Sequence, residues 1–180
     1  MASDKKSKIQ DAAIKLFSEK GYDIATVDEI AKLAGVSKGI VFFYFKSKRE
    51  LIIETALSSV PLKPISEINK THFANIAEML MAFGREFMNI YADADLRKLF
   101  LYTISYKNNY IDLNERLKEL CFTEFDKMFD RGEAMIGKSI PLSIRRAFFG
   151  SLICYIIWWD ESDARRNEYL DSLVKKFMII

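Results

Sequence analysis

Residues 26–51 read TVDEIAKLAGVSKGIVFFYFKSKREL, a stretch that predicts helix, turn, helix, turn and the start of a third helix. Thr26 and Glu29 have the spacing of a capping box, in which each side chain binds the other residue's backbone N–H at a helix start. The apolar residues that follow repeat at three and four, which gives one buried face: Val27, Ile30, Ala31 and Ala34. Gly35 then stands where a helix end favours a residue that tolerates positive φ.

The second and third helices of this stretch carry start signals of their own. Ser37 is a good N-cap, and Ser47 with Glu50 forms another capping box. Two short helices joined by a tight glycine-containing turn make a helix-turn-helix, whose second helix fits the major groove of DNA. The alternative is an ordinary bundle of three amphipathic helices whose charges are merely solvated.

The spacing of these parts resembles the TetR family of transcriptional regulators. The residues that match the family pattern are Thr26, Val27, Ile30, Ala31, Ala34, Gly35, Val36, Ser37, Gly39, Tyr44, Phe45, Lys48 and Leu51, preceded by Ile9, Ala12, Ala13, Leu16, Phe17 and Gly21. The resemblance covers roughly the first fifty-five residues. It implies an all-α chain of about nine helices, with a helix-turn-helix DNA-binding domain over residues 1–60 and a helical ligand-binding and dimerisation domain over 61–180. Pro61 and Pro64 predict an extended link at this boundary.

The geometry of a helix-turn-helix and the resemblance together predict these DNA-binding residues: Thr26, Ser37, Lys38, Gly39, Ile40, Phe42, Phe43, Tyr44, Lys46 and Lys48. Lys38 is able to donate to guanine O6 and N7, and Gly39 lets the backbone approach the groove. Thr26, Tyr44 and Lys48 are expected to contact phosphates, which set register rather than sequence preference.

The chain departs from the family pattern at three positions. Ile40 stands where threonine is common, and Phe42 and Phe43 stand where tyrosines are frequent. Each change removes a hydroxyl, but all three side chains can make apolar contact with thymine methyl groups.

The composition sets limits on the kind of protein. The chain has 180 residues and a formal net charge of only +2, yet residues 1–51 hold ten Lys and Arg against seven Asp and Glu. This small excess of positive charge falls in the segment expected to meet phosphates. No catalytic triad, phosphate-binding loop or metal-ligand spacing is present, so neither an enzyme nor a metal or cofactor site is predicted. Cys121 and Cys154 are expected to be buried, reduced thiols.

Two observations favour a cytoplasmic protein without a membrane segment. The amino terminus leads directly into an amphipathic helix without an apolar signal region. The longest strongly apolar run, residues 147–159, is too short to span a bilayer.

Five helices are predicted in the second domain, over about 70–92, 94–107, 112–136, 142–159 and 162–178. The fourth reads AFFGSLICYIIWW from residue 147 and is apolar nearly all the way round, so it must be covered on more than one side. A homodimer through the last two helices would cover it and would match a palindromic operator. The alternative is a helix buried within a monomer.

The resemblance implies a small effector held in the second domain. Candidate contacts are Phe83, Phe87, Met88, Tyr91, Tyr102, Tyr106, Phe122, Phe125 and Trp158, whose apolar character favours a lipophilic effector. Such a stripe at helical spacing is ordinary core packing far more often than a binding site. The predicted function is a sequence-specific transcriptional regulator, a repressor released from a palindromic operator by this effector. The alternative is a helical module that binds a protein partner or lipid and carries a degenerate helix-turn-helix.

Overall fold

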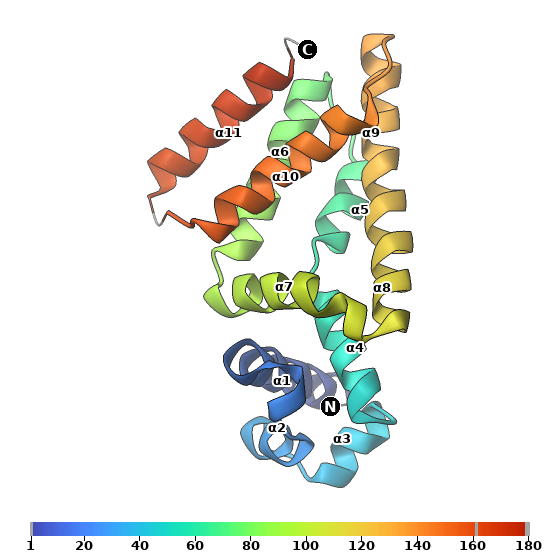
Figure 1. The fold of residues 1–180 in the computed structure, drawn as a ribbon, viewed down its shortest axis with the longest axis vertical. Coiled ribbons are helices and arrows are strands. Elements are labelled where there is room, and N and C mark those ends of the chain that lie inside the picture. The colour runs from blue at the N-terminus through green and yellow to red at the C-terminus, as the bar shows by residue number, and fades with distance from the viewer. Residues whose placement is uncertain (1, 161, 179–180) are drawn as a thin grey trace. The chain divides into compact units, whose positions relative to one another are not determined.

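The computed structural model describes residues 2–160 and 162–178, and within these residues all regular secondary structure is helical (Figure 1). The predicted all-α class is confirmed, with eleven α-helices in the described residues rather than about nine. The chain forms two compact units, one made of Met1–Val60 and Ala94–Arg116 and the other of Pro61–Asp93 and Leu117–Ile180. The segment Ala94–Arg116 thus packs with the amino-terminal residues, although it follows Val60 by more than thirty positions.

The first unit consists of α1 (Ala2–Ile24), α2 (Val27–Ala34), α3 (Lys38–Tyr44), α4 (Lys48–Ser58), α7 (Ala94–Tyr106), a 3₁₀ turn (Lys107–Asn109) and most of α8 (Ile111–Leu117). Its core contains Ile30, which helical spacing placed on an inward face, together with Ile9, Ala13, Phe17, Val41, Phe45 and Leu51. Helices α2 and α3 therefore pack on α1, and α7 contacts α1 and α4 within the same unit.

The second unit consists of α5 (Leu62–Lys70), α6 (Ile76–Tyr91), a π-helical turn (Lys118–Phe122), α9 (Thr123–Ile136), α10 (Leu142–Ile157) and α11 (Asp163–Phe177). The buried face of α6 forms its centre, with Met79, Leu80, Phe83 and Phe87 inaccessible to solvent. The π-helical turn separates α8 from α9, so the single helix predicted over 112–136 is divided.

The extended link predicted after Val60 is wrong, because α5 begins there. Pro61 is its N-cap residue and Pro64 lies in its first turn. A proline is tolerated at that place, since the N–H it lacks would have no partner inside the helix. The two prolines start a helix instead of preventing one.

The helix predicted over 70–92 is observed from Ile76 to Tyr91, so its start was predicted about six residues too early. Helix α5 ends at Lys70, and α6 begins after Asn75, whose side-chain oxygen accepts a hydrogen bond from the Glu78 N–H at 2.9 Å. The Glu78 carboxylate in turn accepts from the Ala74 N–H at 3.1 Å. This local capping arrangement supplies a helix start that the apolar periodicity did not reveal.

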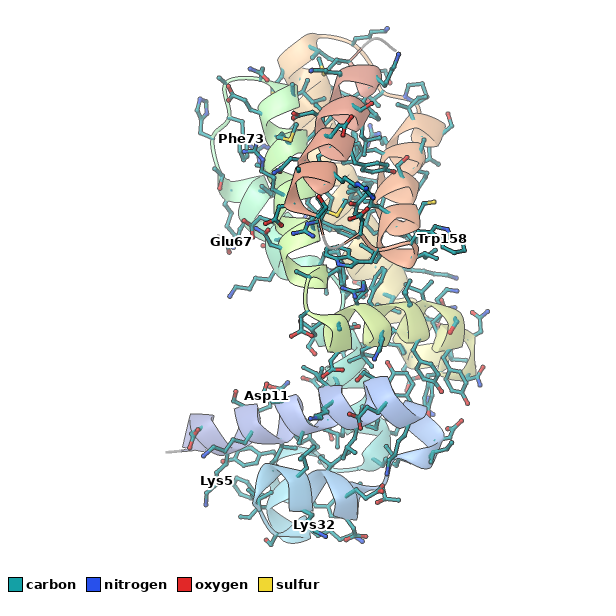
Figure 2. The ribbon with its side chains drawn as sticks, turned by 90° about the vertical axis from the view of Figure 1, so that its left-hand side faces the viewer. Lys5, Asp11, Lys32, Glu67, Phe73 and Trp158 are labelled. Atoms are coloured by element: carbon teal, nitrogen blue, oxygen red, sulfur yellow. The ribbon has the colours of Figure 1, made fainter. Side chains whose placement is uncertain are left out.

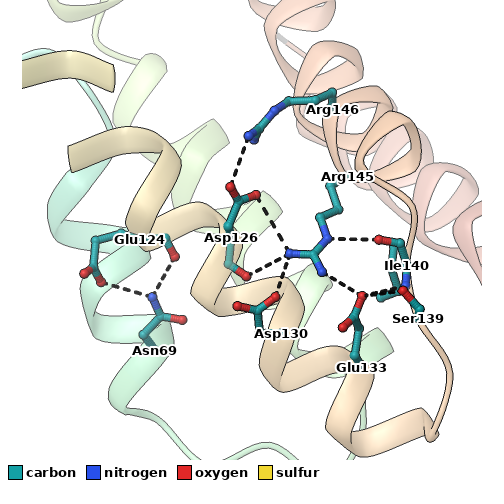
Figure 3. A network of polar contacts seen from close by, with 9 residues as sticks. All are labelled: Asn69, Glu124, Asp126, Asp130, Glu133, Ser139, Ile140, Arg145 and Arg146. Carbon is teal, nitrogen blue, oxygen red and sulfur yellow. Dashed lines mark hydrogen bonds and ion pairs between the residues drawn. The ribbon is translucent and has the colours of Figure 1, made fainter. Parts of the chain in front are cut away.

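An arginine network connects α9 to the start of α10 (Figure 3). The Arg145 side chain is only 12% exposed and donates to Asp130 at 2.7 Å, Glu133 at 2.6 Å and the Ile140 carbonyl at 3.0 Å. The Glu133 carboxylate also accepts from the Ile140 N–H at 2.6 Å. That N–H, followed by Arg145, lowers the pKa of Glu133. The network sets the turn between the two helices.

A buried tyrosine joins α1 to α7 inside the first unit. The Tyr22 hydroxyl lies 2.5 Å from Thr103 Oγ1, which itself donates to the Leu99 carbonyl at 2.7 Å. Gly21 produces a kink in α1, with φ 78° at this residue and helix continuing to Ile24. A Cβ at Gly21 would come within 2.7 Å of the Tyr102 hydroxyl, so the kink lets the two helices approach closely.

We expect Tyr22→Phe to lower the free energy of unfolding at neutral pH by about 1 kcal/mol, because Thr103 loses a donor inside the core. Burial raises the pKa of Tyr22, so its contribution is complete below the ordinary tyrosine value of about 10 and declines as pH rises above it. Urea unfolding at neutral pH and at about pH 11 should therefore show wild type losing more stability than the variant. Tyr44→Phe, at a partly exposed hydroxyl, is the control. Equal losses in wild type and Tyr22→Phe would contradict this assignment.

Candidate nucleic-acid interface

Local hydrogen bonds define both ends of α2 and the turn that leads to α3. Thr26 and Glu29 form the predicted capping box, with the Thr26 N–H donating to the Glu29 carboxylate at 2.9 Å and the Glu29 N–H donating to Thr26 Oγ1 at 3.2 Å. Gly35 takes φ 67°, and the Val36 N–H returns to the Ala31 carbonyl at 3.0 Å. This is a Schellman-type end, which a residue tolerant of positive φ stabilises. The helix-turn-helix geometry therefore follows from contacts within a few residues.

Helix α3 presents a defined outer face. Val41 is 1% exposed and faces the core of the unit. Gly39 and Phe43, two residues to either side of it, lie on the opposite side of the helix. Phe43 is 78% exposed, and its ring meets that of Tyr44 edge-on at 5.1 Å. Gly39 and Phe43 thus form the centre line of the outer face, with Lys38 and Phe42 on one flank and Ile40 and Tyr44 on the other.

The predicted cations lie near α3, but two of them have partners within the unit. Lys38 Nζ lies 2.8 Å from an Asp28 carboxylate oxygen, and Lys48 Nζ donates to the Asp23 carbonyl at 2.9 Å. Lys46 is exposed immediately beyond the end of α3. Both partnered lysines remain accessible enough to exchange these surface contacts for phosphate or base oxygens, since such pairs contribute little.

Two of the three hydroxyl-bearing residues predicted at the interface, Thr26 and Ser37, serve mainly as caps. Thr26 Oγ1 donates to the Glu29 carboxylate at 2.9 Å, and Ser37 Oγ accepts from the Ile40 N–H at 3.4 Å. The Lys20 ammonium, followed by the Thr26 N–H and hydroxyl, lowers the pKa of Glu29 to about 2. An ionised carboxylate therefore lies beside the predicted phosphate contact at Thr26, and a phosphate there would compete with it.

Lysines of α1 also lie close to the helix-turn-helix. Lys5, Lys8 and Lys15 line a shallow groove together with Asp4, Asp11 and residues 33–36, and Lys8 Nζ lies 3.0 Å from an Asp4 carboxylate oxygen. Lys32 projects outward from α2 (Figure 2). Lys6 lies elsewhere on α1, with its Nζ 5.4 Å from the centre of the Phe45 ring. Lys15 was not predicted, and its only sequence signal is a position two helical turns beyond Lys8.

The predicted effector residues do not gather at one place. Phe83, Phe87, Met88, Tyr91 and Phe125 are buried in the core of the second unit. Ring contacts between Phe83 and Phe87, Phe125 and Phe148 fill the space around α6. These residues form a packed core in this structure.

The remaining four effector candidates lie outside that core. Tyr102 and Tyr106 belong to the first unit, where their rings stack at 5.1 Å and both contact Tyr22. Phe122 is 44% exposed and carries the Arg146 guanidinium over its ring at 4.3 Å, while Trp158 is 79% exposed and points outward (Figure 2). A cavity of about 390 Å³ in the second unit has a different lining, chiefly Ile76, Ile136, Ile140, Pro141, Ile144 and Phe177.

Among residues 2–160 and 162–178, no group of three His, Cys, Asp or Glu side chains is arranged to hold a metal ion. No helix in the described part of the chain is long and apolar enough to cross a membrane. The expectation of buried thiols is wrong for Cys154, which is exposed on α10, and the Cys121 side chain lies outside the described residues.

The segment that forms the helix-turn-helix also matches known proteins in sequence. Residues 9–55 match the model of the bacterial regulatory proteins of the tetR family. The chain carries a TetR-family helix-turn-helix domain. This TetR-family domain is 46% identical over 54 residues to the HTH-type transcriptional regulator YhgD of Bacillus subtilis, covering 30% of this chain and 28% of that protein. It is 50% identical over 46 residues to IcaR of Staphylococcus aureus, the negative transcriptional regulator of the biofilm operon icaADBC, covering 26% and 25% of the two chains.

The curated relatives are thus matched over about a quarter of their length. Beyond the TetR-family domain, likeness to solved structures extends over nearly the whole chain. The fatty acid degradation regulator FadR of Bacillus halodurans superposes with a TM-score of 0.75 at 22% identity, covering 97% of this chain and 94% of that one. FadR of Bacillus subtilis, solved in complex with stearoyl-CoA, gives 0.74 at 23% identity over 94% and 97%. Because the identities are only 22% and 23%, these superpositions establish the fold alone.

Proposed function

We propose that this protein is a cytoplasmic, non-enzymatic, sequence-specific regulator of transcription whose α3 enters the major groove of DNA. The observation that carries the proposal is the outer face of α3 in a capped helix-turn-helix, where Phe43 projects and Gly39 leaves the backbone open. No acidic side chain lies on α3, and Lys38, Lys46 and Lys48 lie at its two ends. Such a surface is complementary to a groove bordered by phosphates.

A homodimer through α10 and α11 would place two TetR-family domains on a palindromic operator. One side of α10 is buried by Phe148, Leu152 and Ile156, while the other exposes small or apolar residues: Ala147, Gly150, Cys154 and Ile157. Small side chains let a second helix approach closely, and apolar ones gain from being covered. Sedimentation should detect a dimer at micromolar concentration, and a monomer alone would contradict this arrangement.

Release by a lipophilic effector is the regulatory part of the proposal. The second unit is rich in aromatic and aliphatic side chains, and FadR of Bacillus subtilis, which shares the fold, binds stearoyl-CoA. Because Phe83, Phe87 and Phe125 fill the core here, an effector that used them would have to displace part of this packing. We propose repression rather than activation because IcaR, a relative of the helix-turn-helix domain, is a negative regulator.

Selection of bound duplexes from a random DNA pool tests the proposal. We expect wild type to enrich a palindrome and Tyr44→Ala to enrich none, because Tyr44 is a predicted DNA contact on a flank of α3. An unchanged thermal unfolding midpoint in Tyr44→Ala would show that the fold survives. Wild type that enriches no sequence at low salt would contradict DNA regulation.

The two lysines at the ends of α3 should behave differently. We expect Lys38→Ala to change base preference, because its ammonium lies beside the outer face of α3. We expect Lys48→Ala to weaken all duplexes alike and to reduce the salt slope by about one unit, as loss of one phosphate contact does. Binding titrations on the enriched and a scrambled duplex, each at several salt concentrations, measure both quantities. Preference-neutral losses in both variants would refute this division of roles.

A second candidate function rests on the exposed phenylalanines. Phe42 and Phe43 are 40% and 78% exposed, and they lack the hydroxyls common in the family pattern. A protein partner or a lipid could cover such side chains, in which case the helix-turn-helix would no longer recognise DNA. The selection distinguishes the two, since this alternative enriches no sequence.

A further inference from the structure

We infer that α3 distinguishes bases chiefly by the C5-methyl groups of thymine, with Phe43 as the residue that contacts them. The inference rests on the proposed function and names what its interface recognises. It follows from the chemistry of the seven α3 side chains and from which of them face outward.

Helix α3 offers few groups for hydrogen bonding to bases. Its sequence is KGIVFFY, so only Lys38 and Tyr44 have polar side chains. Lys38 lies at the first position of α3, on a flank of its outer face, and its exposed pair with Asp28 at 2.8 Å can be exchanged for only a single base or phosphate contact. Tyr44 lies on a flank rather than on the centre line. Arginine, asparagine and glutamine recognise bases by paired hydrogen bonds to their edges, and α3 has none of these residues.

The centre line of the outer face is instead apolar. Long side chains in a helix lean toward its amino end, so the Phe43 ring extends over the turn that contains Gly39. Gly39 adds no side chain there, and a Cβ at this position would have only Ser37 Oγ within 4 Å, at 3.9 Å. The edge-on contact with Tyr44 restrains the Phe43 ring. The most exposed group of α3 is therefore an oriented aromatic ring above an open stretch of backbone.

Only one apolar group of the four standard bases projects into the major groove, and it is the C5-methyl of thymine. Phe43, flanked by Phe42 and Ile40, matches that group and gains nothing from the polar edges of guanine or cytosine. Burying phenylalanine against a polar base edge would also leave that edge without a hydrogen-bond partner. The selected half-sites should therefore place thymines opposite Phe43.

The test compares thymine with uracil, which differs only in lacking the methyl group. Random duplex pools are prepared in parallel with dT and with dU in place of dT, and each is selected with wild type. The palindrome enriched from the dT pool is then resynthesised with dU at single positions. We expect affinity to fall about fourfold for each contacted methyl that is removed, hence roughly fifteenfold with one in each half-site. Substitution of dU outside the palindrome should have no effect.

Variants of Phe43 make the assignment specific. Phe43→Ala should bind the dT and dU forms of the palindrome alike, whereas Phe43→Leu should keep part of the preference. Both should unfold at the wild-type temperature, because the side chain is exposed. Thymine preference that is retained in Phe43→Ala would overturn the role of Phe43. Equal wild-type affinity for the dT and dU palindromes would overturn methyl recognition while leaving sequence-specific binding in place. No enrichment from either pool would overturn the proposed function, and this inference with it.

Discussion

Gly39→Leu is expected to abolish operator binding while leaving the protein folded. Gly39 lies on the centre line of α3, where a leucine would project into the groove and hold the helix backbone away from the bases. Loss of base contacts leaves the non-specific affinity, which is about a thousandfold weaker or more. The fold should not suffer, because the space beyond Gly39 is open and leucine favours a helix by about 0.8–1 kcal/mol relative to glycine.

Fluorescence anisotropy with the enriched palindrome and a scrambled duplex measures this loss, and thermal unfolding checks the fold. Gly39→Ala is the graded control, since a single methyl group should cost only part of the affinity. If Gly39→Leu bound the palindrome as tightly as wild type, α3 would not approach the bases along this face. Loss of DNA binding without loss of stability would show that Gly39 is needed for binding and not for folding.

The second large effect concerns the core of the second unit. Phe83 is fully buried among Phe87, Phe125 and Phe148, with ring centroids 5.9–6.5 Å away. We expect Phe83→Ala to lower the free energy of unfolding by about 3–5 kcal/mol, because it removes apolar contacts and leaves a cavity. Urea denaturation followed by circular dichroism measures the change.

Phe122→Ala is the matched control for Phe83→Ala. Its ring is 44% exposed, so its loss should cost under about 1 kcal/mol. The comparison also separates two roles of Phe83. A side chain that lined a preformed ligand cavity would already lack neighbours on one side, and its removal would cost far less than one from a packed core. A small loss for Phe83→Ala would therefore favour an effector cavity beside α6.

Prediction from the sequence succeeded for the helix-turn-helix and was weaker for the second unit. The caps at Thr26, Ser37 and Ser47 start α2, α3 and α4 at the expected residues. The second unit has longer helices whose ends depend on packing as much as on caps. The start of α5 was missed because the two prolines predicted an extended link, and the start of α6 was predicted too early because the apolar periodicity continues through residues 71–75.

The candidate sites differ in the same way. The residues expected at the DNA interface fall within 26–48, and a capped helix-turn-helix brings them together automatically. The effector candidates are spread from Phe83 to Trp158, and periodicity reports only that each lies on an apolar helix face. Helix packing decides whether such faces line a cavity or contact one another directly. Here Tyr102 packs on Tyr22 in the first unit, and Phe83 packs on Phe125 in the second.

Residue types within 26–51 are enough to predict the helix-turn-helix, because its caps and its Gly35 turn are contacts between residues three to five positions apart. Tertiary packing instead brings Lys38 to Asp28, Lys48 to the Asp23 carbonyl and Ala94–Arg116 to the amino-terminal unit. These contacts join residues ten or more positions apart, and their geometry depends on how whole helices pack. Local hydrogen bonds are encoded by neighbouring residue types, whereas the surroundings of a side chain are set by every helix that packs around it.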